Sequence, residues 1–172
     1  MTDDNRIRLL ITGGTFDKEY DEINGRLFFK DSHVPEMLKL ARCKLELEIR
    51  TLMMVDSLEM TDTDRTIIVE QCRGTPEQRI VITHGTDTME VTARAIATAV
   101  TDKVIVLTGA MIPYKFKSSD GLFNLGSALA FVQTLPAGVY VAMNGRCFNA
   151  DSVYKNRQTG TFEATPNGEG GK

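Results

Sequence analysis

The chain has 172 residues, of which 42% are hydrophobic and 25% charged, and its formal net charge is −3. That length suits one domain with a single core, and the composition is that of an ordinary globular protein. The slight acidity argues against nucleic acid as a partner, because the chain has no basic excess to neutralise phosphates. No apolar run approaches the roughly 20 residues of a membrane span, so we expect no membrane contact.

The cysteines and histidines bear on the compartment and on metals. Cys43, Cys72 and Cys147 are widely spaced and odd in number, which predicts free thiols rather than a disulfide framework. With only two histidines and no CxxC pair, we expect no metal site. The polar, acidic start at residues 1–5 is unlike a signal peptide. The chain is therefore predicted to be cytoplasmic.

Short apolar runs alternate with helical patterns along most of the chain. Runs rich in Val, Ile and Leu predict strands at residues 6–12, 45–55, 79–84, 103–108 and 139–144. Helices are predicted between them, at residues 34–42, 61–73, 87–100 and 120–135. Pro35 suits a first helical turn, and Thr61 or Asp62 suits the cap of the second helix. The alternation predicts an open, mostly parallel, flavodoxin-like α/β sheet with helices on both faces.

Two further segments complete the expected organisation. Asn24-Gly25 lies between residues 17–23 and 26–29 and predicts a β-hairpin with a two-residue turn. That turn would place Tyr20 opposite Phe29 and Glu19 opposite Lys30. One interpretation is a surface hairpin without a role in the site. The other, which its position directly after the first strand favours, is a lid over the ligand site. We expect one domain at residues 1–163 and a flexible, Gly-rich tail at 164–172.

The first candidate site motif is Gly13-Gly14-Thr15, directly after the first strand. Two glycines there permit close backbone approach to a ligand and leave the Thr15 hydroxyl beyond the sheet. The chain has no GxGxxG pattern, which argues against a dinucleotide site. Residues 13–17 also resemble the GG-[ST]-FD motif of nucleotidyltransferases. The two histidines that this family needs are missing here, so that interpretation fails.

The second candidate motif runs from Thr83 to Glu90, between the third strand and the third helix. Its purely structural interpretation is that Thr86 or Asp87 caps the helix. A hydroxyl and a carboxylate at a helix N-terminus also suit a ligand that carries both a carboxylate and an amine. In that interpretation Asp87 receives the ammonium group.

Three segments together resemble the bacterial-type L-asparaginase/glutaminase family. They are Thr12-Gly-Gly-Thr15, Thr83-His-Gly-Thr-Asp-Thr-Met-Glu90, and Leu107-Thr-Gly-Ala-Met-Ile-Pro113 followed by Ser119-Asp-Gly-Leu-Phe-Asn-Leu125. The likeness extends from about residue 6 to residue 162. It implies the N-terminal, catalytic domain of that family, in a short-chain form that lacks the C-terminal domain.

The resemblance implies a role for each matching residue. Thr15 matches the primary nucleophile and Thr86 the second catalytic threonine, while Asp87 matches the carboxylate that binds the substrate ammonium. Lys155 matches the catalytic lysine when residues are counted without a gap from Asn144. Tyr20 matches the lid tyrosine, although its spacing from Thr15 is much shorter here. The remaining matches are expected to bind substrate: Gly14, Asp56, Ser57, Leu58, Gly85 and Ala110.

Three of these matches carry specific expectations. Ser57 is expected to hold the substrate carboxylate, and the Ala110 carbonyl is expected to face the substrate amide. Leu58 departs from the family, whose members often have a polar residue, commonly Gln, near the substrate ammonium. We therefore expect weaker substrate binding and a preference for Asn over Gln.

The implied activity is hydrolysis of L-asparagine to L-aspartate and ammonia, without a cofactor, through a threonine acyl-enzyme. Because the family forms dimers and tetramers, we expect a homodimer or homotetramer. The alternative is a non-catalytic module that binds asparagine or aspartate. The retained threonines, Asp87 and Lys155 argue against this alternative, because a binding module does not need a nucleophile.

Overall fold

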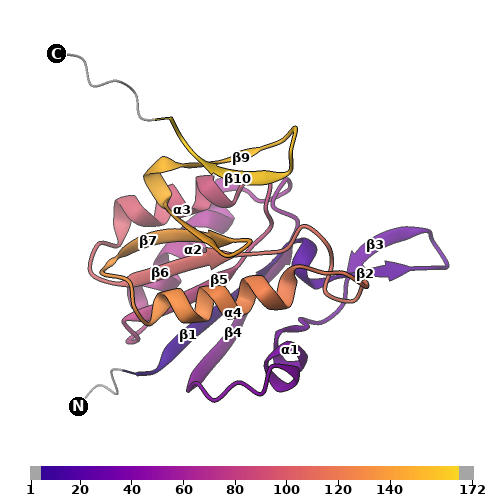
Figure 1. Ribbon diagram of the computed structural model, residues 1–172, viewed down its shortest axis with the longest axis horizontal. Coiled ribbons are helices and arrows are strands. Elements are labelled where there is room, and N and C mark those ends of the chain that lie inside the picture. Colours follow the sequence, from indigo (N-terminus) through magenta and orange to yellow (C-terminus); the bar gives the residue numbers. More distant parts are fainter. Residues whose placement is uncertain (1–4, 167–172) are drawn as a thin grey trace.

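The computed structural model describes residues 5–166 and centres on a six-stranded sheet. Five strands run parallel: β1 (Ile7–Gly13), β4 (Leu47–Val55), β5 (Arg79–Thr83), β6 (Val104–Thr108) and β7 (Gly138–Met143). A sixth strand, β8 (Arg146–Asn149), pairs antiparallel with β7 and was not predicted. The order is β4-β1-β5-β6-β7-β8 (Figure 1). The predicted open, mostly parallel sheet is confirmed.

Helices cover both faces of this sheet (Figure 1). One apolar core lies beneath α2 (Asp62–Gly74) and α3 (Met89–Ala99), and the other beneath α1 (Val34–Leu40) and α4 (Gly121–Val132). Successive strand residues alternate between the two cores, as the pleat requires: Leu10 contributes to the first and Leu9 to the second. Over residues 5–166, no helix is long and apolar enough to cross a membrane.

The observed helix starts agree with the predicted ones except at α3. Thr61 caps α2 in a capping box, with its hydroxyl accepting from the Asp64 N–H and its own N–H donating to the Asp64 carboxylate. Pro35 lies in the first turn of α1, as predicted. The interpretation of Thr86 or Asp87 as the cap of α3 is wrong, because Thr88 occupies that position. The side chains of Thr86 and Asp87 are consequently left for other contacts.

The predicted hairpin exists, as β2 (Lys18–Asp21) and β3 (Arg26–Phe29), and it projects from the body of the molecule (Figure 1). Its predicted register is wrong. Tyr20 lies opposite Leu27 rather than Phe29, and Glu19 lies opposite Phe28 rather than Lys30.

The connection has four residues, 22–25, and Asp21 explains why. Its carboxylate accepts hydrogen bonds from the N–H groups of Ile23 and Asn24, at 3.1 and 3.2 Å, and so folds the turn locally. Gly25 then closes the turn with a positive φ of 64°. An aspartate that organises its own turn outweighs the two-residue preference of Asn-Gly.

The C-terminal part forms a second hairpin that the sequence analysis did not assign. After a short 3₁₀ turn, η2 (Ala150–Ser152), β9 (Val153–Asn156) pairs antiparallel with β10 (Thr161–Ala164). Val153 and Phe162 are buried in the core beneath α3 and anchor the hairpin there. The predicted tail thus begins inside β10, and the Thr165 N–H donates to the Ser152 carbonyl at 2.9 Å. The rest of the predicted tail, residues 167–172, lies outside the described residues.

Gly14 sits where two strand ends meet backbone to backbone. Its φ is 76°, and a Cβ built on it would lie 2.4 Å from the Gly85 Cα. Its N–H donates to the Val55 carbonyl at 3.0 Å, just after the register of β1 and β4 shifts. No side chain larger than hydrogen fits this contact without moving the chain.

We expect Gly14→Ala to lower the free energy of unfolding by more than about 2 kcal/mol, because the added methyl is strained and overlaps Gly85. Gly126→Ala is the matched control. Gly126 lies inside α4 with no atom within 4 Å of a built Cβ, so alanine there should stabilise the protein by about 0.5–1 kcal/mol. Urea unfolding of both variants checks this, and equal effects of the two would contradict it.

Candidate active site

The carboxyl ends of three parallel strands bring most of the predicted residues to one edge of the sheet. β1 leads into Gly14 and Thr15, β4 into Asp56 and the residues after it, and β5 into Gly85. Such an edge is where open α/β sheets bind their ligands. The Gly14–Gly85 contact holds the first and third of these loops together.

Ser57, in the loop after β4, packs against the Gly14–Gly85 contact. A Cβ built on Gly85 would lie 2.5 Å from the Ser57 Oγ, so the serine packs directly against the glycine. Ser57 is only 2% exposed, and its Oγ has no hydrogen-bond partner among the described residues. A buried hydroxyl without a partner is costly unless a ligand or water satisfies it. This geometry suits the binding of a polar group of a ligand.

Lys155 reaches this edge from β9, almost 70 residues further along the chain. Its Nζ donates to the Thr86 Oγ1 and to the Asp87 Oδ1, both at 2.8 Å. The lysine side chain is 8% exposed and Thr86 is 4% exposed, so the contact is shielded from water. An ammonium group held against a hydroxyl favours the deprotonated form of that hydroxyl.

Arg157, also from the β9–β10 hairpin, makes a second contact with Asp87. Its Nη1 lies 3.4 Å from the Asp87 Oδ1, and its Nη2 donates to the Asp87 carbonyl at 3.0 Å. The Asp87 carboxylate therefore faces two cations, Lys155 and Arg157. Sequence reasoning missed Arg157, since nothing in the sequence placed the turn after β9 beside α3.

The other predicted binding residues differ in what they offer. The Asp56 carboxylate is occupied, since it accepts from the Lys18 ammonium and from the Leu58 N–H. Partial burial opposes its charge, but these hydrogen bonds outweigh burial and keep the pKa of Asp56 below its ordinary value. The Leu58 side chain is exposed at 65%. Ala110, which is only 1% exposed, follows β6 at the same edge of the sheet.

Asn124 on α4 fixes the turn that contains Ala110. Its Nδ2 donates to the Gly109 carbonyl and its Oδ1 accepts from the Asn144 N–H, both at 2.9 Å. Asn124 is fully buried, so these bonds are sheltered from water. The residue was noted only as part of a motif, and its bridging position follows from the packing of α4 between two strand ends.

Tyr20 is not brought into this group. Its side chain is 55% exposed, and within residues 5–166 it makes no hydrogen bond. The hairpin that carries it is anchored at its base, by Lys18 on Asp56 and by Glu19 on His33, whose Nε2 lies 3.4 Å away. The lid role of the hairpin stays a prediction.

His84 lies beneath the site and is fully buried. Its Nδ1 lies 2.8 Å from the Gly85 carbonyl and its Nε2 2.8 Å from the Thr92 hydroxyl. Burial, the largest effect, lowers the pKa of His84 to about 4, so its imidazole is neutral at pH 7. A neutral ring that faces a carbonyl must carry its proton on Nδ1.

The residues that could hold a metal do not cluster. Between residues 5 and 166, no group of three His, Cys, Asp or Glu side chains is close enough to bind one. The three cysteines are free, as predicted, and burial raises the pKa of Cys72 to about 12.

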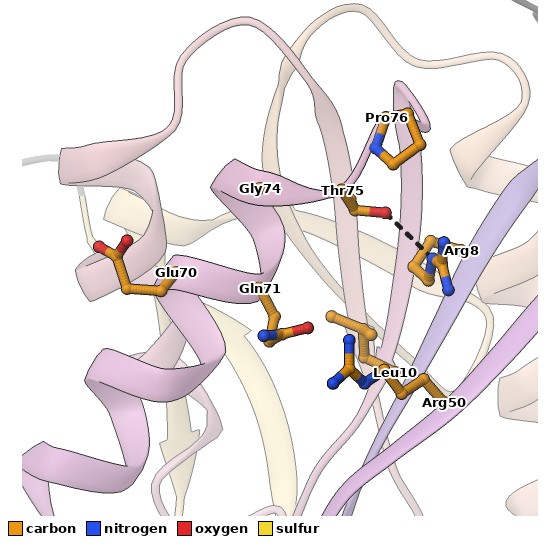
Figure 2. Close-up of a pocket in the computed structure, with 8 residues that line it drawn as sticks. All are labelled: Arg8, Leu10, Arg50, Glu70, Gln71, Gly74, Thr75 and Pro76. Carbon is orange, nitrogen blue, oxygen red and sulfur yellow. Dashed lines mark hydrogen bonds between the residues drawn. The ribbon is translucent and has the colours of Figure 1, made fainter.

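A cavity of about 260 Å³ opens elsewhere, between α2 and the strands β1 and β4 (Figure 2). It contains none of the predicted site residues. Its Arg8 guanidinium is already held by the Thr75 hydroxyl at 3.0 Å and by the Glu77 carboxylate. One exposed arginine, Arg50, then faces the cavity, and we assign no ligand to it.

Comparison with known proteins decides the family. The family described as "Asparaginase, N-terminal" matches residues 6–169. The chain belongs to the asparaginase family. This confirms the resemblance drawn from the three motifs.

Relatives in this asparaginase family support the same conclusion. The chain is 38% identical over 134 residues to a probable periplasmic L-asparaginase of Haemophilus influenzae, covering 73% of this chain and 37% of that protein. It is 50% identical over 80 residues to a glutaminase-asparaginase of Acinetobacter glutaminasificans, covering 44% of this chain and 24% of that protein. It superposes on the thermostable L-asparaginase of Thermococcus kodakarensis with a TM-score of 0.82 and 28% identity, covering 92% of this chain and 51% of that one. The chain thus spans about half, or less, of the length of these relatives.

The buried His84 gives this asparaginase-family chain a specific pH dependence of stability. An unfolded histidine has a pKa of about 6.5, so between pH 6.5 and 4 the unfolded state binds the extra proton. We expect this residue to contribute its full stabilisation above pH 6.5 and to lose about 2–3 kcal/mol of it by pH 4.5. Urea unfolding at pH 7.5 and 4.5 measures the loss, with His84→Gln as the variant that lacks it. Parallel pH dependences of parent and variant would refute the assignment.

Proposed function

We propose that the chain hydrolyses L-asparagine to L-aspartate and ammonia, with Thr15 as nucleophile and without a cofactor. The observation that supports this most strongly is the contact of Lys155 with Thr86 and Asp87. Lys155 lies 69 positions after Thr86 and 68 positions after Asp87 in the sequence, yet its ammonium contacts both. The residue before Thr86, Gly85, packs against Gly14, which directly precedes Thr15. Membership of the asparaginase family supports the same reaction class.

Binding of the substrate follows from the charges at the site. The buried Ser57 hydroxyl, which has no partner among the described residues, donates to the substrate carboxylate. Asp87 receives the substrate ammonium through the part of its carboxylate that Lys155 and Arg157 leave open. The Ala110 carbonyl faces the amide to be cleaved. Leu58 supplies no hydrogen bond here, so we expect Asn to be preferred over Gln.

The chemistry then needs an activated hydroxyl and a proton relay. The Thr15 Oγ attacks the amide carbon, and its proton passes to the Thr86 oxygen in the deprotonated form that the Lys155 ammonium favours, while Asp87 orients the lysine. Backbone N–H groups of the glycine-rich turns stabilise the oxyanion. The relay returns the proton to the leaving nitrogen, so ammonia departs and an aspartyl ester of Thr15 remains. Water, activated by the same relay, hydrolyses the ester and frees aspartate.

The second candidate function is a non-catalytic asparagine- or aspartate-binding module. What favours it is the site itself, since Asp87 and Ser57 can hold an amino acid without any reaction. What favours hydrolysis is that the threonine–lysine contact is shielded from water, which simple binding does not require. We further propose a homodimer or homotetramer, as the family resemblance implies, and a cytoplasmic location, which the free cysteines favour.

We expect Thr15→Ala, Thr86→Ala and Lys155→Met each to lower ammonia release from L-asparagine by at least about 10³-fold, because members of one catalytic unit are individually essential. The control is Thr98→Ala, an exposed threonine on α3, which should leave the rate unchanged. A coupled ammonia assay on L-asparagine and L-glutamine provides the measurement. Equal turnover of the two amides would contradict the substrate preference. No release by the parent, with clear binding of L-aspartate, would establish the binding module instead.

Arg157 should weaken the binding of asparagine, because its guanidinium competes with the substrate ammonium for Asp87. The pair is exposed, at 61% for the arginine side chain, so its effect is limited to about 1 kcal/mol. We expect Arg157→Gln to lower KM for L-asparagine about three- to five-fold. Lys39→Gln, which removes an exposed cation from α1, is the control and should not change KM. A raised KM in Arg157→Gln would show instead that the arginine assists binding.

A further inference from the structure

Arg65 on α2 makes an unusual set of contacts for a helix-surface arginine. Its side chain is only 11% exposed. Its Nη1 donates to the Met60 carbonyl at 3.2 Å, its Nη2 to the Thr88 Oγ1 at 3.1 Å, and its Nε to the Thr92 Oγ1 at 3.2 Å. The Asp62 carboxylate, which lies 3.3 Å from Nη1, is fully exposed. The guanidinium is therefore committed to the loop after β4 and to the start of α3.

The first path leads from Arg65 to Ser57. Thr88 accepts from the guanidinium and donates its own hydroxyl proton to the Ser57 carbonyl, at 2.9 Å. Met60, held by the same guanidinium, lies three residues further along the loop that carries Ser57. Arg65 thus fixes this loop at two points.

The second path leads from Arg65 to the peptide before Thr86. Thr92 accepts from the arginine Nε and donates to the His84 Nε2, at 2.8 Å. The neutral His84 then donates from Nδ1 to the Gly85 carbonyl, at 2.8 Å. Every hydrogen bond in this series is donated in the direction from Arg65 to Gly85, and the side chains of His84 and Thr92 are fully buried. Such a buried, fully satisfied path is rigid.

We propose that Arg65 is a positioning residue, which sets the spacing between Ser57 and Thr86 by holding both loops from one planar guanidinium. This inference rests on the proposed function, in which Ser57 holds the substrate carboxylate and Thr86 takes part in the reaction. The arginine fork presents its N–H groups at fixed angles, and a lysine ammonium cannot reach three separated acceptors in the same way. A displacement of about 1 Å between such groups can cost about 100-fold in rate.

The test compares kcat and KM for L-asparagine in Arg65→Met and Arg65→Lys with those of the parent, well below the melting temperature of each. We expect Arg65→Met to raise KM and lower kcat, for a loss in kcat/KM of about 10- to 100-fold per folded molecule. Arg65→Lys should recover only part of this loss. Arg73→Met is the control on the same helix and should match the parent, because Arg73 is exposed and, among residues 5–166, pairs only with Glu70.

Thr88→Val keeps the inference testable if the Arg65 variants fold poorly. It preserves the volume of the side chain but removes the link between Arg65 and Ser57. We expect it to raise KM at least about three-fold with little change in melting temperature, which a merely structural role would not produce. Unchanged kcat and KM per folded molecule in both Arg65→Met and Thr88→Val would overturn the proposal.

Binding of the product separates this inference from the proposed function. If the parent releases no ammonia, the proposed hydrolysis fails, and the Kd for L-aspartate then tests Arg65 alone. A Kd raised about 10-fold or more in Arg65→Met supports the positioning role, and an unchanged Kd overturns it. A parent that neither releases ammonia nor binds L-aspartate overturns both.

Discussion

The structure depends on the close approach of two chain segments at Gly14 and Gly85, where neither has room for a side chain. This contact brings the ends of β1 and β5 together, and Ser57 packs against it from β4. Because backbone rather than side chains fills the centre, the loops after β1, β4 and β5 lie against one another. A larger residue at either glycine would push apart the loops that carry Thr15 and Thr86.

Much of the sheet could be predicted because its central strands, β1, β5 and β6, are buried on both faces. Continuous apolar runs such as those around Ile80 and Ile105 are typical of parallel strands, and each was found close to its predicted range. The parts that failed depend on local details. The Asp21 carboxylate folds the turn of the first hairpin, and α3 begins two residues later than predicted, with Thr88 in the N-cap position. The β9–β10 hairpin escaped prediction because it packs only Val153 and Phe162 into a core built by other elements.

The residues of the candidate site also fall into those that the sequence could predict and those that only tertiary packing reveals. Residues in short motifs, such as Thr86 and Asp87, could be singled out because a strand end followed by polar residues is informative without tertiary structure. Lys155 was reached by counting along the chain, and the structure places its ammonium against both of these residues. Arg65 could not be found, because it looks ordinary in the sequence, and His84 belongs to a motif that gives it no role of its own. Their connection exists only once α2, α3 and two loops are packed together.

The late position of Lys155 also bears on how the molecule is assembled during synthesis. All five parallel strands, and the threonine and aspartate near residue 86, lie before Asn144, so the sheet can form from the earlier part of a nascent chain. The lysine follows only with β9, whose hairpin adds Val153 and Phe162 to the core beneath α3. A nascent chain that stops short of this hairpin lacks both the ammonium group and two side chains of that core. Completing the site therefore requires more of the chain than pairing the five parallel strands does.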